Sequence, residues 1–163
     1  MIIIGNLVSL IGCILMVAVG FVRKKEHMLL VQCVQFGFMG AGHLLLGAVS
    51  GMLSCVISVI RNVVFSRTQG TVWLKLVFIG VQVVLTLCFG ADSWIHWLPV
   101  IACAVFVWYL DIKDAALFKI IIIVTQIFWC VYDFYFQNYV AFTFDVLTIV
   151  SNAIGIYIIK RRV

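Results

Sequence analysis

SVIRNVVFSR, residues 58–67, carries Arg61 and Asn62 inside an otherwise apolar run. TIVSNAIGIYIIKR, residues 148–161, has a similar pattern, and its asparagine, Asn152, lies 90 residues after Asn62. The same shift of 90 residues pairs three further polar positions: Arg23 with Lys113, His43 with Asp133, and Ser58 with Thr148. Two copies of one three-helix unit, separated by an additional helix, account for this spacing.

The composition indicates that lipid surrounds most of this chain. Of its 163 residues, 66% are hydrophobic and 10% are charged. A soluble domain of this length needs far more polar surface. The net charge of +5 arises at the ends of apolar segments, which favours membrane insertion over nucleic-acid binding. Six cysteines lie inside apolar runs without a CxxC pair, so we expect buried side chains and no metal site.

Seven segments have the length and apolarity of membrane-spanning helices. A helix crosses a hydrocarbon core of about 30 Å with about 20 apolar residues. The predicted spans are residues 2–22, 28–48, 52–66, 72–90, 94–110, 116–135 and 140–159. No positive charge precedes the first apolar core and no small-residue cleavage site is evident, so the first span is predicted to be retained.

The basic residues predict the orientation of these spans. With the N-terminus outside, all eleven Lys and Arg residues lie at or near cytoplasmic span ends: Arg23, Lys24, Lys25, Arg61, Arg67, Lys75, Lys113, Lys119, Lys160, Arg161 and Arg162. A change of one in the number of helices would distribute them over both sides. The positive-inside rule therefore supports seven spans and a cytoplasmic C-terminus.

The repeat and the orientation together predict an all-α membrane protein with a 3+1+3 arrangement. Residues 1–67 would form the first three-helix bundle, residues 68–91 a linker transmembrane helix, and residues 92–163 the second three-helix bundle. Because the fourth span restores the chain direction, the two bundles would be parallel repeats related by an axis along the membrane normal.

Several segments resemble the YgjV family of bacterial inner-membrane proteins over nearly the whole chain. They are VRKKEHMLLVQ (22–32), GHLLLG (42–47), SVIRNVVFSR (58–67), WCVYDFYF (129–136) and FDVLTIVSN (144–152). This resemblance implies a multi-pass protein of the bacterial inner membrane. The three-one-three arrangement with an asparagine in the third helix of each half also resembles SWEET, PQ-loop and PnuC-type transporters. Their Pro-Gln signature is missing here, and Pro99 is the only proline.

The resemblance to sugar transporters implies that Asn62 and Asn152 line a substrate pocket. An unpaired amide is costly in hydrocarbon, so both should face the bundle interior. There they would either join helices by hydrogen bonds or bind a hydroxylated or heterocyclic ligand. The full set of substrate-binding candidates is Ser58, Asn62, Gln126, Trp129, Thr148 and Asn152.

Three ionisable residues, His43, Asp133 and Asp145, are candidates for gating or proton transfer, because such groups are costly at membrane depth. The alternatives are a structural tie between helices or, for Asp133, exposure to lipid headgroups. Arg61 is expected to extend its side chain to the cytoplasmic interface, the alternative being contact with an anionic group in the pocket. Trp129 shares a helix face with further aromatic residues, which either pack against lipid or form a stacking wall for a planar ligand.

These features favour a facilitator or transporter of a small, polar, uncharged metabolite, with a site between the two bundles. A membrane receptor, a scaffold or an assembly subunit with a packed interior remains an alternative. No Ser-His-Asp order, glycine-rich phosphate loop or HExxH motif occurs, so we expect neither an enzyme nor a cofactor. The expected partners are the lipid bilayer and an unidentified metabolite, and no nucleic acid is expected to bind. The sequence leaves open whether the chain forms a homo-oligomer.

Overall fold

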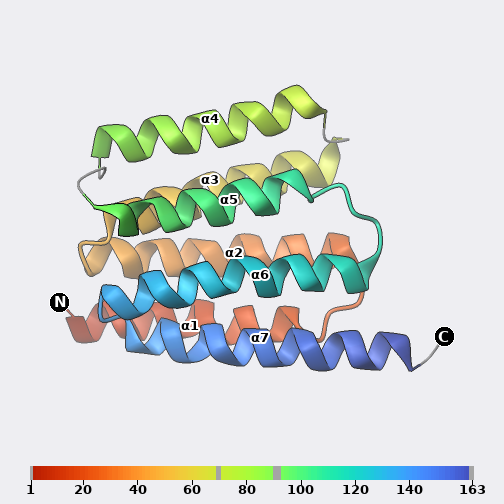
Figure 1. The fold of residues 1–163 in the computed structure, drawn as a ribbon. Coiled ribbons are helices and arrows are strands. Elements are labelled where there is room, and N and C mark those ends of the chain that lie inside the picture. The colour runs from red at the N-terminus through yellow and green to blue at the C-terminus, as the bar shows by residue number, and fades with distance from the viewer. Residues whose placement is uncertain (1, 69–70, 90–92, 162–163) are drawn as a thin grey trace.

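The computed structural model describes residues 2–68, 71–89 and 93–161, and all regular structure in these ranges is helical (Figure 1). Its elements are α1 (Ile2–Val19), α2 (Lys25–Leu45), α3 (Val49–Arg67), α4 (Val72–Phe89), the 3-10 helix η1 (Trp94–Trp97), α5 (Leu98–Trp108), α6 (Ala115–Tyr135) and α7 (Tyr139–Lys160). The all-α prediction is confirmed. Arg162, the predicted end of the fourth span at residue 90 and the predicted boundary between residues 91 and 92 lie outside the described residues.

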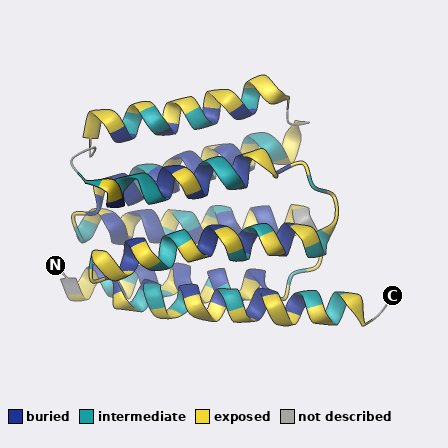
Figure 2. Cartoon of the chain, viewed as in Figure 1, coloured by how far each residue is buried: buried dark blue, intermediate teal, exposed yellow. Residues whose placement is uncertain are grey.

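Five helices are long and apolar enough to cross a membrane: α2, α3, α4, α6 and α7. Two apolar helices, Ile3–Val19 and Trp94–Trp108, are shorter. Large apolar side chains cover the outer faces of the bundle, where Figure 2 shows exposed residues. An apolar exterior of this kind requires lipid as its solvent. The structure is therefore that of a multi-pass membrane protein.

The helices pack as two rows of three with α4 beside them (Figure 1). In one row α2 lies between α1 and α3, and in the other α6 lies between α5 and α7. The rows meet where α1 packs against α7 and α3 against α5, while α4 contacts α3 and α5. The backbones of α2 and α6 make no comparably close contact, which leaves room for side chains in the interior between them.

Two turns in the chain have the same backbone geometry at a distance of 90 residues. Gly47, after α2, has a φ of 78°, and Gln137, after α6, has a φ of 56°. Ala48 before α3 has φ −82° and ψ 68°, and Asn138 before α7 has φ −83° and ψ 66°. A glycine adopts the left-handed region readily, whereas a glutamine does so rarely. The same turn is thus built twice from different residues.

The C-terminal end of α1 is held by a buried lysine from α6. The Lys119 ammonium donates to the carbonyl oxygens of Val19 at 3.4 Å, Gly20 at 2.7 Å and Val22 at 3.1 Å. A helix C-terminus offers unpaired carbonyls and a negative dipole end, so it accommodates a cation well. Gly155 on α7 permits this arrangement, because a Cβ there would collide with the Gly20 carbonyl.

Candidate functional site

A polar cavity lies between the two rows of helices. Its volume is about 50 Å³, and α1, α2, α3, α5, α6 and α7 all contribute to its lining. The polar lining residues are Gln32, Gln35, His43, Ser54, Ser58, Arg61, Thr125, Gln126, Asp133, Asp145 and Thr148. At ~10–15 Å³ per enclosed water, the cavity holds on the order of four water molecules. It is therefore small in this conformation.

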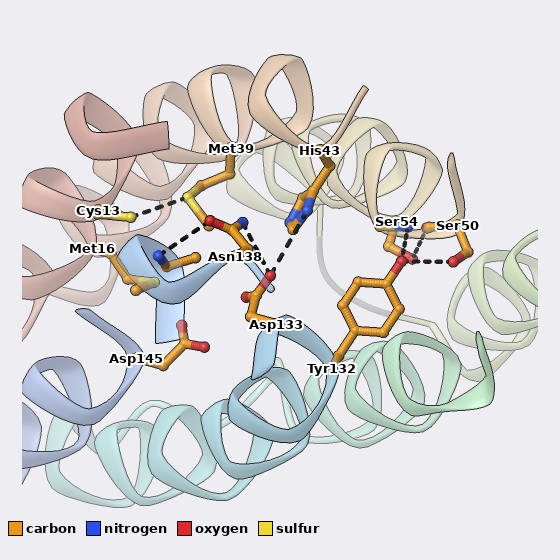
Figure 3. Close-up of polar contacts among 12 residues, drawn as sticks. Cys13, Met16, Met39, His43, Ser50, Ser54, Tyr132, Asp133, Asn138 and Asp145 are labelled. Atoms are coloured by element: carbon orange, nitrogen blue, oxygen red, sulfur yellow. Dashed lines mark hydrogen bonds and ion pairs between the residues drawn. The ribbon is translucent and has the colours of Figure 1, made fainter. Parts of the chain in front are cut away.

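Two fully buried carboxyl groups, those of Asp133 and Asp145, face each other at this cavity. Gln126 Nε2 donates to Asp145 Oδ1, and Asn138 Nδ2 donates to Asp133 Oδ1 at 3.2 Å. The second oxygen of each carboxyl has no hydrogen-bond donor (Figure 3). Two adjacent buried carboxylates repel each other strongly, so a proton held between them would satisfy both free oxygens.

His43 lies beside this pair on the opposite row of helices. Its Nδ1 is 3.8 Å from Asp133 Oδ1, and the imidazole is 1% exposed (Figure 3). This separation is too long for a hydrogen bond, and neither ring nitrogen has a partner. The ring stacks on Trp129, with centroids 5.8 Å apart. The structure thus brings together His43 and Asp133, which the 90-residue shift had matched, and buries Asp133 instead of exposing it to headgroups.

Tyr132 packs against the lining residues His43 and Trp129, at the end of the cavity that carries the turns after α2 and α6. Its hydroxyl hydrogen-bonds to Ser50 Oγ at 2.8 Å and accepts from the backbone N–H of Gly51 at 2.9 Å. Ser50 Oγ also lies 2.9 Å from His96 Nδ1 on η1. Gly51 belongs to the first turn of α3, whose N-cap Ala48 has no capping side chain. The Tyr132 hydroxyl therefore supplies the missing cap from the opposite row.

An apolar layer separates the cavity from a wider opening at the other end. This opening has a volume of about 870 Å³ and a rim of exposed charged side chains that includes Arg23, Lys24 and Lys113. Five residues of one buried cluster divide between the two spaces: Val19, Phe106 and Ile122 line the cavity, while Leu29 and Leu110 line the opening. Apolar packing thus lies between the cavity and the basic end, and the Tyr132 contacts lie at the opposite end.

The nine residues predicted from the sequence divide into two groups. Seven line the cavity: His43, Ser58, Gln126, Trp129, Asp133, Asp145 and Thr148. Asn62 and Asn152 are fully buried outside the lining and bond to neighbouring residues. Asn62 Oδ1 accepts from Arg61, and Asn152 Nδ2 donates to the Thr148 carbonyl at 2.9 Å. The structure does not bring the two asparagines together.

Arg61 occupies the place at the cavity that Asn62 was expected to take. Its side chain is 2% exposed and does not extend to the interface, which corrects the expectation from the sequence. The guanidinium carbon lies 4.3 Å from the Phe106 ring centroid, and Nη1 is 3.8 Å from Cys103 Sγ. Ser54, Ser58 and Arg61 recur at helical spacing and share one face of α3. That polar stripe was the signal in the sequence that Arg61 faces inward.

Comparisons with known proteins identify a family. No curated protein and no solved structure matches the chain significantly. These comparisons therefore do not support the predicted relation to SWEET, PQ-loop and PnuC-type transporters. The model of the family Imp-YgjV, described as bacterial inner membrane protein, matches residues 3–163. The chain accordingly belongs to the Imp-YgjV family of bacterial inner membrane proteins, and it is a multi-pass protein of that membrane.

Proposed function

We propose that the protein is a facilitator or transporter of a small polar metabolite, with its site in the cavity between the two rows of helices. The observation that carries this proposal is the cavity itself. Eleven of its lining side chains are polar, although it lies inside an apolar protein. Polar and ionisable side chains are expensive at membrane depth and usually mark a pathway for a substrate or an ion. The proposal assigns the protein no enzymatic activity.

The proposed transporter has seven spans in a 3+1+3 arrangement, with the N-terminus outside and the C-terminus in the cytoplasm. Residues 1–67 and 92–163 are the two bundles, and α4 is the linker. Three features support this arrangement: α2 and α6 begin and end 90 residues apart, the turns after them share a left-handed backbone conformation, and the basic loops lie at one end. The shorter helices, Ile3–Val19 and Trp94–Trp108, would cross a locally thinned bilayer.

Alternating access follows from the two closures of the cavity. Rocking of one bundle against the other would open the apolar layer toward the basic opening, or the Tyr132 contacts toward the outside, one at a time. His43, Asp133 and Asp145 are the candidates for gating or for coupling to a proton. The carboxyl pair joins α6 to α7, while His43 belongs to α2, so a proton moving between them would alter a contact between the bundles.

A receptor or scaffold is the second candidate function. The observation in its favour is the small volume of the cavity, about 50 Å³, because a protein that only signals or assembles needs no wide pathway. The asparagines Asn62 and Asn152 are also held by neighbouring residues, as expected in a packed interior. In either case the partners proposed include the lipid bilayer and exclude nucleic acid.

Water access to the cavity distinguishes the two functions. In a variant without native cysteines that still folds, single cysteines replace Ser58 or Thr148, which line the cavity. A membrane-impermeant thiol reagent is then applied from each side in separate experiments. Labelling from both sides supports transport, whereas labelling from one side alone favours a receptor. Absence of labelling from either side means a packed interior and overturns the transport proposal.

Two control positions calibrate this experiment. Lys113→Cys lies on the exposed basic rim and should react from the cytoplasmic side alone. Reaction of Lys113→Cys from the outside would instead contradict the proposed orientation. Val63→Cys lies on the outer face of α3, 41% exposed, and lipid should protect it from both sides. Labelling of Val63→Cys would mean that the reagent reaches sites in lipid, and the cavity data would then be discarded.

A further inference from the structure

Among the described residues, no acidic side chain pairs with the positive charge of Arg61. Its guanidinium has five N–H donors and stays protonated in proteins. Nε and Nη2 both donate to Asn62 Oδ1, at 3.1 and 3.0 Å, and Nη1 points at the weak acceptor Cys103 Sγ. Among the residues that the structure describes, two contacts join a basic side chain to an acidic one: Lys75 pairs with Asp111, and His43 lies near Asp133, where an ion pair requires a protonated imidazole. Arg61 is in neither of them.

The other two buried cations differ from Arg61 in this respect. The Lys75 ammonium pairs with Asp111 and donates to the Trp108 carbonyl, and the Lys119 ammonium has three carbonyl acceptors. A buried charge without a counter-charge is costly, and the Phe106 ring and the Asn62 oxygen compensate that of Arg61 only in part. Arg61 alone of these three lines the cavity. An anion entering the cavity would therefore find a desolvated guanidinium with free donors.

The same cavity contains acceptors that lack donors. Gln35 Oε1 is buried without a hydrogen-bond partner. Asp133 Oδ2 and Asp145 Oδ2 have none beyond a proton held between them, which leaves each oxygen a lone pair that can accept. Asp133 lies near the C-terminal end of α6, beside the turns, whereas Arg61 lies in the half of α3 nearer the basic end. The cavity thus offers an anion site toward one end and sites for hydrogen-bond donors toward the other.

We propose that Arg61 binds the carboxylate of a small hydroxy- or amino-carboxylate, whose hydroxyl or amino group donates to the free acceptors. The planar guanidinium fork matches the two oxygens of a carboxylate. A space for on the order of four waters admits a ligand of this size and excludes nucleotides and phospholipid headgroups. This inference rests on the proposed function and replaces the uncharged metabolite expected from the sequence with an anionic or zwitterionic one.

Calorimetric titration of the full-length protein in phosphatidylcholine nanodiscs, at constant ionic strength, tests the proposal. The probes are glycolate, glycine, acetate and glycolamide, which is the neutral analogue of glycolate. We expect glycolate or glycine to bind, and glycolamide to bind about tenfold to a hundredfold more weakly, because it lacks the charged hydrogen bonds. Acetate should be intermediate, since it has no donor group.

Three variants extend the test. Arg61→Met should lose glycolate and glycine binding, while Arg61→Lys should keep part of it. Lys75→Met is the matched control, because it removes a buried cation away from the cavity that already has an acidic partner, and it should bind as the wild type does. If Arg61→Met fails to fold, the comparison of glycolate with glycolamide on the wild-type protein and the binding by Arg61→Lys still test the proposal.

Four results would overturn the inference. They are equal binding of glycolamide and glycolate, retained binding by folded Arg61→Met, acetate binding as tightly as the hydroxy and amino probes, and no binding of any probe to folded wild-type protein. None of these results affects cysteine labelling from the two sides of the membrane. Failure of the ligand class is therefore distinguishable from failure of the transport proposal.

Discussion

Replacing Tyr132 with phenylalanine removes one hydroxyl group from the proposed outer closure of the cavity and leaves the ring in place. The hydroxyl bonds to Ser50 Oγ and to the Gly51 N–H, and the tyrosine is fully buried. In Tyr132→Phe the Gly51 N–H becomes an unpaired amide in the first turn of α3, while Ser50 retains His96. A lost helix cap and an unsatisfied buried donor each cost about 1–3 kcal/mol.

This cost falls on the closed state, because the contact joins α6 to the start of α3 across the two rows of helices. If the outer opening separates these elements, the amide regains water there and the penalty disappears. A shift of about 1–3 kcal/mol changes the ratio of open to closed protein by about 5- to 150-fold. We therefore expect a cysteine at position 148 to react with an external thiol reagent faster by a factor in this range.

The assay compares labelling rates of Thr148→Cys with and without Tyr132→Phe, in the background without native cysteines. Tyr139→Phe is the control, since this tyrosine is 55% exposed and its removal should leave the rate unchanged. An unchanged rate in folded Tyr132→Phe would refute the assignment of Tyr132 to the outer closure. A loss of thermal stability without faster labelling would assign the hydroxyl to folding alone.

Substitutions at three further positions test the packing around the site by thermal unfolding in detergent. Lys119→Met should destabilise the protein by about 2–5 kcal/mol, because the carbonyls at the end of α1 lose a charged donor; an unchanged midpoint would refute this. Gly155→Val should lower the stability by about 1–3 kcal/mol or prevent folding, because the valine side chain would collide with the Gly20 carbonyl. A variant as stable as the wild type would contradict that clash. Asp145→Asn should keep a stability near that of the wild type. Asp145→Ala leaves Gln126 Nε2 without its carboxyl acceptor and should lower the stability by about 1–3 kcal/mol. Equal stability of the two variants would count against that hydrogen bond.

Helix positions were predictable because apolar length and charged ends are strong local signals. With η1 and α5 counted together, the predicted spans and the observed helices differ by three residues or fewer at each described end, for example residues 28–48 against Lys25–Leu45. The shift of α2 toward the N-terminus has a local reason, since Glu26 lies in its first turn, where the helix dipole favours an acidic side chain. A reading based on hydropathy alone excludes such charged residues from the helix.

Neighbouring residues on one helix illustrate what could not be predicted. Arg61 and Asn62 are both polar, and adjacent helical residues point about 100° apart, so only one of them can face the cavity centre. Which one does so depends on the rotation of α3, which is set by its packing against α2 and α5. The close contact of Gly155 with Gly20 similarly fixes the rotation of α7 and leaves Asn152 outside the lining. These rotations depend on contacts between distant segments, which a single sequence does not reveal.

The proposed repeat has one consequence for the ligand. Helices α2 and α6 and the turns after them match, yet the cavity residues His43, Cys55 and Arg61 correspond to residues of different chemistry. These are Asp133 and Asp145, which also line the cavity, and Ser151, which lies outside the lining. The first half thus supplies the basic groups and the second half supplies the acids. A backbone with approximate two-fold symmetry accepts a ligand in two equivalent orientations, but this distribution of charge removes the equivalence. A ligand with a carboxylate and a separate donor group would bind in one orientation, with the carboxylate toward the basic end.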